Sequence, residues 1–201
     1  MNFKYIDQPR NFASYLENDT VCETCGNLRK CFDATLFFGT AELQIICEQC
    51  LAEGKLNDLD VYTCEGDIEE LENQIRLQHP LMPEKELQAL VKQRTTELEK
   101  TTPHLITWQD WPWPAAEGDY CRFIGYGSKN FYQKHSPTSP QQFFEETLYH
   151  YQKDIHDAEE LWEELNEEDI PTYDDSAKYS TLFYVFESQV SGKIVTVWEK
   201  N

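Results

Sequence analysis

Long apolar runs are absent from this sequence of 201 residues. None approaches the roughly 20 residues that a membrane-spanning helix needs, which argues against an integral membrane protein of the helical kind. Met1-Asn2-Phe3-Lys4-Tyr5 is soon followed by Asp7 and Arg10, and this opening lacks the apolar core of a secretory signal. We therefore expect a protein of the cytoplasm, with no membrane partner.

Basic residues are scarce. Seventeen Lys and Arg stand against thirty-seven Asp and Glu, which gives a formal net charge of −20. Nucleic-acid backbones and anionic lipid surfaces repel such a chain overall, so we expect neither as a partner. A basic protein would be attracted to it, although acidity alone is also a common route to solubility.

Familiar catalytic signatures are lacking as well. The sequence has no Gly-rich phosphate loop, no catalytic zinc motif and no spacing typical of a nucleophile and its base, and its five His show no ligand spacing. These absences predict a protein that is not an enzyme. An enzyme of unknown reaction stays open as the alternative, with a cleft near Trp108–Cys121, although simple aromatic packing also explains that segment.

Cysteine pairs are the strongest signal present. Cys22 and Cys25 form one C-x2-C pair, and Cys47 and Cys50 form another, with twenty-one residues between the pairs. Two intervening residues let one tight turn aim two thiolates at a single ion, and Gly26 permits the backbone geometry that such turns need. We predict one structural zinc held by all four sulfurs, with no open coordination position; an iron centre or disulfides are the alternatives.

The remaining cysteines, Cys31, Cys64 and Cys121, are interpreted as small buried side chains or idle thiols. Zinc knuckles also suggest a nucleic-acid binder. That alternative is disfavoured by the net charge, because the segment 22–50 contains only Arg29 and Lys30 as basic residues.

Periodicity and turn residues predict an α+β fold, in which a small zinc-knuckle module, several helices and a C-terminal β-hairpin pack as one compact domain over 1–201. We expect a strand over 31–38 and a short helix over 47–52. The expected parts are a zinc module at about 19–56, a helical insert at about 65–100, an acidic helical segment at about 140–170 and a hairpin at about 180–199.

The acidic helical segment has one apolar stripe. Its members recur at steps of three and four residues and are predicted to face the core: Phe144, Leu148, Tyr151, Ile155, Ala158, Trp162 and Leu165. The range 145–175 contains thirteen acidic residues and one Lys. This face is either an ordinary solvated surface or a docking surface for a basic protein, such as a nuclease toxin.

Several motifs, taken in order, resemble the bacterial CbrC family. They cover most of the chain and are the segments 19–26 and 46–54 around the cysteine pairs, Thr102-Pro103, Trp108-Gln109, Trp113-Pro114, 118–121, 123–125 and 182–187. The family is associated with tolerance to nuclease-type colicins. The resemblance implies a protective, colicin-tolerance or immunity-like role and no catalytic activity.

The sequence departs from that family at a second set of positions. The resemblance predicts Cys where Glu117 stands, and a C-x2-C-G where 188–192 reads Ser-Gln-Val-Ser-Gly. Only Cys121 of that set remains. We therefore expect no second metal, and we expect Cys121 to lie near the hairpin turn.

Overall fold

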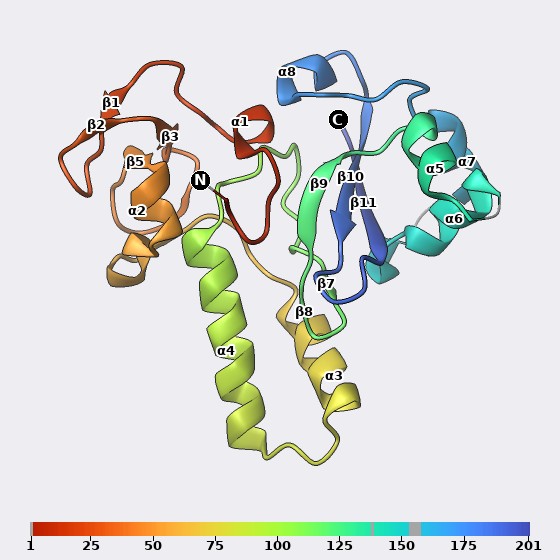
Figure 1. The fold of residues 1–201 in the computed structure, drawn as a ribbon, viewed down its shortest axis with the longest axis horizontal. Coiled ribbons are helices and arrows are strands. Elements are labelled where there is room, and N and C mark those ends of the chain that lie inside the picture. The colour runs from red at the N-terminus through yellow and green to blue at the C-terminus, as the bar shows by residue number, and fades with distance from the viewer. Residues whose placement is uncertain (1, 138, 153–157) are drawn as a thin grey trace.

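The first part of the chain folds into short antiparallel ladders around one small helix (Figure 1). The structure is a computed structural model that describes residues 2–137, 139–152 and 158–201. After helix α1 (Pro9–Phe12), strand β1 pairs with β2, β3 with β5, and β4 with β6. The elements of this part are β1 (Thr20–Val21), β2 (Leu28–Arg29), β3 (Cys31–Asp33), β4 (Phe38–Gly39), β5 (Ile45–Cys47), α2 (Glu48–Ala52), the 3-10 helix η1 (Lys55–Asp58) and β6 (Val61–Tyr62).

The strand predicted over 31–38 is shorter in the structure, and this part of the prediction is wrong. Strand β3 ends at Asp33, because the Asp33 carboxylate accepts hydrogen bonds from the backbone N–H and the hydroxyl of Thr35, at 2.9 and 2.6 Å. This local bond turns the chain out of the ladder. The helix predicted over 47–52 is confirmed as α2.

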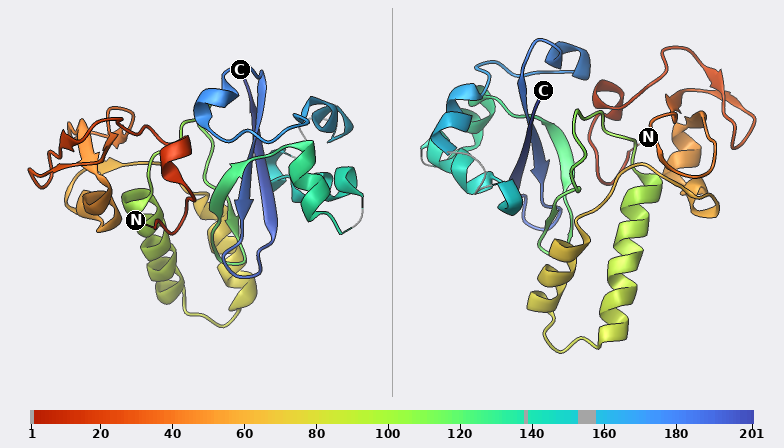
Figure 2. Two further views of the ribbon diagram at one scale, coloured as in Figure 1. Left: turned by 45° about the horizontal axis from the view of Figure 1, so that its top comes forward. Right: turned by 180° about the vertical axis from the view of Figure 1, so that it is seen from behind.

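Two antiparallel helices, α3 (Ile68–Gln78) and α4 (Glu84–Thr101), project from the body as a hairpin (Figures 1 and 2). Helix α3 begins where the Asp67 carboxylate accepts from the backbone N–H of Glu70 at 3.0 Å. Lys100, in the last turn of α4, donates to the carbonyl oxygens of Leu59 and Val61 at 3.0 and 2.6 Å. These bonds fasten the hairpin to the N-terminal ladders.

The C-terminal part is built on a three-stranded antiparallel sheet in the order β11-β10-β9. Its strands are β9 (Arg122–Tyr126), β10 (Thr181–Glu187) and β11 (Ile194–Lys200). A small ladder of β7 (Ala115–Ala116) and β8 (Asp119–Tyr120) precedes β9. The predicted hairpin is present as β10 and β11, and β9 adds a partner on the other side of β10.

Strand β10 separates two hydrophobic clusters because successive side chains of a strand point to opposite faces. Tyr184 and Phe186 lie in the larger cluster, which extends to the N-terminal part and the helical hairpin. Phe183 and Val185 lie in a second cluster under the C-terminal helices. Both faces of the sheet are thus covered, which explains why β10 is apolar along nearly its whole length.

In the described part of the chain four α-helices follow β9, and three of them border the second cluster. They are α5 (Lys129–His135), α6 (Pro140–Thr147), α7 (Ala158–Glu164) and α8 (Tyr173–Ser176), with the 3-10 helix η2 (His150–Gln152) between α6 and α7. Phe144, Leu148 and Leu165 are buried as predicted, and Trp162 is partly buried against the same cluster. Ile155 and the side chain of Tyr151 lie outside the described residues.

The apolar residues of the stripe recur at unbroken steps of three and four in the sequence. In the structure they do not lie on one continuous helix. Helix α6 ends at Thr147, and the backbone N–H of Tyr149 donates to the Thr196 carbonyl of β11 at 2.9 Å. On α7 the fully buried residue is Leu161, while Ala158 is only partly buried. The chain gives up helical bonds at this point to pair with the sheet.

Helices and small antiparallel sheets together make one compact α+β body, as the sequence predicts. Among the described helices, none combines the length and apolar character that crossing a bilayer would require.

Candidate metal centre

Four cysteine sulfurs gather between the N-terminal ladders and α2. The Sγ atoms of Cys22, Cys25, Cys47 and Cys50 all lie within 4.8 Å of one another, and those of Cys25 and Cys47 are 3.9 Å apart. A tetrahedral ion with metal–sulfur bonds of about 2.3 Å holds its sulfurs about 3.8 Å apart. The cluster therefore has the size and the donor set to hold one metal ion.

The first cysteine pair is carried by a tight turn after β1. The Gly26 N–H donates to the Cys22 carbonyl at 2.8 Å, and the Cys22 N–H donates to the Asn27 carbonyl at 3.0 Å. Gly26 has a φ of 71°, a left-handed conformation that glycine adopts without steric cost. The geometry that the sequence suggested for Gly26 is thus the one that folds Cys25 back toward Cys22.

The second pair uses the start of α2. Cys47 is the last residue of β5 and the N-cap of α2, and its sulfur accepts from the Cys50 N–H at 3.4 Å. The Cys47 N–H in turn donates to the Cys22 sulfur at 3.2 Å. Backbone N–H groups aimed at sulfur favour the thiolate form, which is the form that binds a metal.

Burial and hydrogen bonding act in opposite directions on these thiols. Cys22, Cys47 and Cys50 are buried, and burial raises the pKa of the Cys47 and Cys50 thiols. Cys25 is exposed, and a backbone hydrogen bond from Asn27 lowers its pKa to about 6. Buried thiolates need a neighbouring positive charge, and a metal cation supplies one. The donor set therefore fits a soft divalent cation such as zinc.

Cys31 is adjacent to this cluster but is not part of it. It is paired across the β3–β5 ladder with Cys47, and its thiol lies 3.4 and 3.3 Å from the carbonyl oxygens of Thr20 and Arg29, to which it donates. Burial raises the pKa of the Cys31 thiol to about 11. These contacts agree with its interpretation as a buried, protonated side chain.

A protein-family model described as "Uncharacterised protein family (UPF0167)" matches residues 1–183. The chain belongs to this family. The CbrC family, which the sequence resembles, is the same UPF0167 family. The match includes all four clustered cysteines, whereas β11 lies beyond it. No solved structure matches the chain.

The positions where the UPF0167 resemblance predicts further cysteines also come together. One carboxylate oxygen of Glu117 accepts hydrogen bonds from the hydroxyls of Ser188 and Ser191. Cys121 is buried nearby, and burial raises its pKa while Lys193 of the hairpin turn lies within electrostatic reach. The structure thus joins these positions through a carboxylate and two hydroxyls, and it places Cys121 near the hairpin turn.

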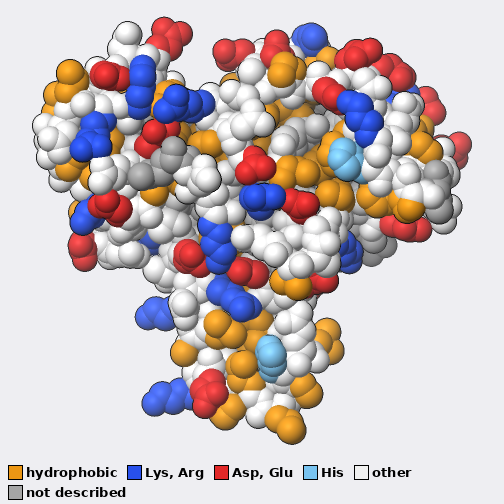
Figure 3. Space-filling model, viewed as in Figure 1, with side chains coloured by type: hydrophobic (Ala, Val, Ile, Leu, Met, Phe, Trp, Pro, Cys, Tyr) orange, Lys and Arg blue, Asp and Glu red, His pale blue; other side chains and the backbone are white. Residues whose placement is uncertain are grey.

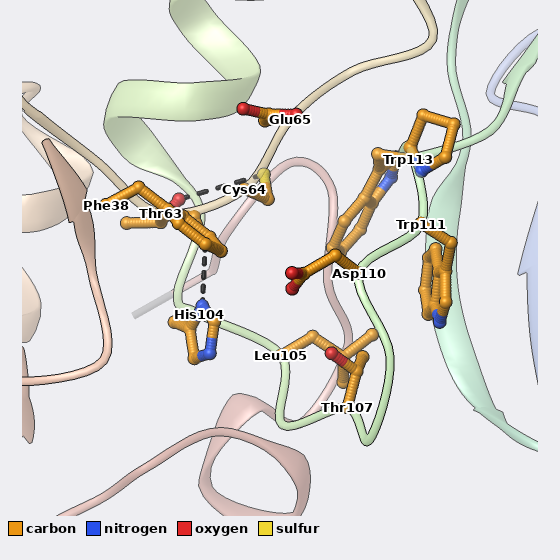
Figure 4. A pocket seen from close by; sticks show the side chains of 11 residues that line it. Phe38, Thr63, Cys64, Glu65, His104, Leu105, Thr107, Asp110, Trp111 and Trp113 are labelled. Atoms are coloured by element: carbon orange, nitrogen blue, oxygen red, sulfur yellow. Dashed lines mark hydrogen bonds between the residues drawn. The ribbon is translucent and has the colours of Figure 1, made fainter. Parts of the chain in front are cut away.

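The Trp-rich segment borders a cavity of about 320 Å³ (Figure 4). The residues that line this cavity differ from those that the sequence suggested. Trp111 and Trp113 line it, whereas Cys121 lies outside it and accepts the Trp113 indole N–H at its backbone carbonyl, at 2.8 Å. Cys64 and His104 line it as well. Sequence reasoning missed both, because lone Cys and His residues far apart in the chain carry no spacing signal.

Proposed function

We propose that this chain is a zinc-stabilised protein of the cytoplasm that acts by binding a basic protein and carries out no chemistry of its own. The observation that carries the proposal is the closure of the metal centre. Four sulfurs within 4.8 Å of one another fill a tetrahedral coordination shell and leave no position for a substrate or water. A site of this kind stabilises a fold, and a reducing compartment keeps its thiols available to the metal.

The acidic segment supplies the attractive surface, but only some of its carboxylates are candidates for contacts with a partner. Glu164, Glu167 and Asp169 form ion pairs with lysines of the same molecule, at 2.7, 2.8 and 3.0 Å. These three carboxylates hold α5 and β11 in place and are already partly neutralised. They are poor candidates for contacts with a partner.

Helix α7 carries three further candidates, chosen for their exposure. Glu159, Glu160 and Glu163 are exposed on it, while Leu161 faces the core. Figure 3 shows Asp and Glu side chains along the upper right edge of the molecule, where the C-terminal helices lie. Such a patch steers a positively charged protein toward it. The family association with nuclease-type colicins makes a basic nuclease domain the candidate partner.

The alternative, an enzyme acting through the cavity beside Trp111, has less support. Burial raises the pKa of the Cys64 thiol to about 12, so the thiol is protonated at neutral pH and a weak nucleophile. Its sulfur lies 3.8 Å from the Thr63 hydroxyl, which is not a general base. His104 is instead bonded to the Thr63 carbonyl.

The test is binding of the full zinc-loaded chain to an immobilised nuclease domain of a nuclease-type colicin. We expect association to slow as salt rises from about 50 to about 300 mM, because screening shortens the reach of surface charges. A triple variant, Glu159→Gln, Glu160→Gln and Glu163→Gln, should weaken binding by about tenfold.

Two controls make the test specific. A matched variant with Glu17→Gln, Glu42→Gln and Asp58→Asn removes the same charge from exposed positions of the N-terminal part and should bind like the wild type. Cytochrome c, a basic protein of unrelated shape, should bind far more weakly. Equal loss in both triple variants, or equal binding of cytochrome c, would show that only net charge matters and would contradict the proposal.

A further inference from the structure

The cavity beside Trp111 lies where three distant segments meet. Phe38 comes from β4, Cys64 follows β6, and the other wall is formed by the segment between α4 and β7. Its volume of about 320 Å³ falls within the range of small-molecule sites. The cavity is separate from the four-cysteine cluster, because none of the four cysteines lines it.

Aromatic side chains make up much of its wall. Phe38 stacks on Tyr62, with ring centroids 5.4 Å apart, and meets the His104 ring at 5.9 Å. On the other side, Trp113 packs against Phe186 at 5.2 Å. The Trp113 ring is buried behind this wall, whereas the Phe38 ring is half-buried and keeps part of its surface toward the cavity.

The polar groups of the cavity are chiefly hydrogen-bond acceptors or negative charges. Figure 4 shows the Asp110 carboxylate pointing into the space bordered by His104, Cys64 and Trp113. His104 Nδ1 bonds the Thr63 carbonyl at 2.7 Å, so Nδ1 carries the proton and Nε2 is left as an acceptor. Burial lowers the pKa of His104, which favours this neutral ring.

Positive side chains are missing from this lining. All the lining residues belong to the described part of the chain, and none of them is Lys or Arg. Glu65 at the rim adds a second carboxylate, which accepts from the Tyr62 hydroxyl at 3.2 Å. An anionic ligand would meet repulsion from these carboxylates, with no Lys or Arg in the lining to offset it.

The segment that carries Asp110 is held in place by Glu199. The buried carboxylate of Glu199 accepts from the backbone N–H groups of Trp108 and Gln109 at 2.9 and 3.0 Å, and from the Trp111 indole at 3.0 Å. Asp110 lies in the middle of this fastened stretch. Its carboxylate is therefore presented by a backbone that is already ordered, which lowers the entropic cost of binding.

We propose that this cavity binds a small organic cation that carries an amine or guanidine group on an apolar or aromatic body. The positive group pairs with the Asp110 carboxylate, and the apolar body packs against the half-buried Phe38 ring. Aromatic faces and a carboxylate are the two features that recognise such cations. This site is distinct from the α7 surface proposed above for a protein partner.

Three probes of nearly the same shape test the charge preference: benzylamine, benzyl alcohol and benzoate. Each is titrated into the zinc-loaded full-length chain, followed by tryptophan fluorescence and by amide shifts in NMR spectra. We expect benzylamine to bind with a dissociation constant on the order of 1 mM, since fragments of this size reach such affinities. Benzyl alcohol should bind about fivefold more weakly and benzoate more weakly still. The shifted amides should lie in 63–65 and 104–113.

Matched variants then test the role of Asp110 in binding. Asp110→Asn should reduce benzylamine binding to the level of benzyl alcohol and leave benzyl alcohol itself unchanged. Asp58→Asn, an exposed aspartate outside the cavity, should change neither. Benzoate binding as tightly as benzylamine, shifts that map to α7, or an unaffected Asp110→Asn variant would each overturn the proposal. Because Asp110 lies outside α7, an unaffected Asp110→Asn variant would leave the proposed binding of a nuclease domain untouched.

Discussion

Glu117 and Ser191 lie 74 residues apart in the sequence, and a hydrogen bond of 2.6 Å joins the carboxylate to the hydroxyl. Ser188 donates to the same oxygen, so two hydroxyls of the β10–β11 turn hold one carboxylate of the β7–β8 turn. Glu117 has a φ of 55° and Gly118 a φ of 83°, the left-handed pair that a two-residue type I′ hairpin needs. A non-glycine residue is strained in this conformation, and the two serines help to keep it there.

Two replacements of Glu117 distinguish the effect of backbone strain on stability from the effect of the hydrogen bonds. Glu117→Ala loses both bonds and keeps the strained backbone, so we expect a loss of about 1–2 kcal/mol in the free energy of unfolding. Glu117→Gly loses the same bonds but relieves the strain, and should be more stable than Glu117→Ala by about 1 kcal/mol. Urea denaturation of the zinc-loaded variants measures both. Equal stability of the two variants would mean that the turn carries no strain.

The same carboxylate predicts a dependence on pH. The Ser188 and Ser191 hydroxyls lower the pKa of Glu117 in the folded state below its unfolded value of about 4.3. The unfolded state therefore binds the proton first, so the stabilisation is complete above the unfolded pKa and is lost as pH falls through the folded one. The stability gap between wild type and Glu117→Gln should be full at about pH 7 and shrink below about pH 4. A constant gap would contradict this assignment.

The candidate metal centre predicts different outcomes for the replacement of two cysteines. Cys25→Ser removes one ligand, and we expect it to lose its zinc and at least about 3 kcal/mol of stability, because metal binding is coupled to folding. Cys31→Ser lies next to the centre, but its hydroxyl can still donate to the carbonyl oxygens that the thiol contacts. It should keep one zinc per chain. Metal analysis of both purified variants checks this, and zinc loss from Cys31→Ser would mean that the ligands are assigned wrongly.

Glu199 should be the most sensitive carboxylate of the C-terminal sheet. It is fully buried and also accepts from the Tyr184 hydroxyl, in addition to its three bonds to the 108–111 segment. Glu199→Gln places an amide donor against other donors and should cost about 2–4 kcal/mol. Glu187→Gln, on the less buried end of β10, should cost less than half as much. Thermal unfolding of the two variants, with Trp fluorescence as the probe, compares them directly.

Neighbouring residues of α3 give a matched pair. Ile75 is fully buried and Leu77 is 82% exposed. Ile75→Ala should cost about 2–5 kcal/mol through lost burial and an added cavity, whereas Leu77→Ala should stay within about 0.5 kcal/mol of wild type. Denaturant unfolding tests the pair. A large loss in Leu77→Ala would show that the exposed end of the hairpin is covered in solution.

Local sequence signals were sufficient to predict much of the fold. The spacing of apolar residues and the proline before α4 predict the helical hairpin, and the turn residues Ser191 and Gly192 predict the β10–β11 hairpin. The C-x2-C spacing predicts the sulfur cluster, and the structure brings all four sulfurs together. The identity of the metal stays a prediction.

The features that the sequence did not predict depend on contacts between segments far apart in the chain. Nothing near Leu148 signals the end of α6, because the chain leaves the helix there to bond with Thr196 of β11. The cavity was equally hidden, since Phe38 and His104 are brought together only by packing between distant segments. Contacts of this kind depend on the whole tertiary arrangement rather than on any sequence window.

The bond between Glu199 and Trp108 spans 91 residues, and this separation imposes an order on folding during synthesis. The cysteine cluster needs only residues 22–50, so it can assemble while most of the chain is still unmade. The wall that presents Asp110 must wait until residue 199 has left the ribosome, on the order of ten seconds later at ordinary translation rates. A nascent chain stalled in that interval would have an assembled cysteine cluster and still have an unformed pocket.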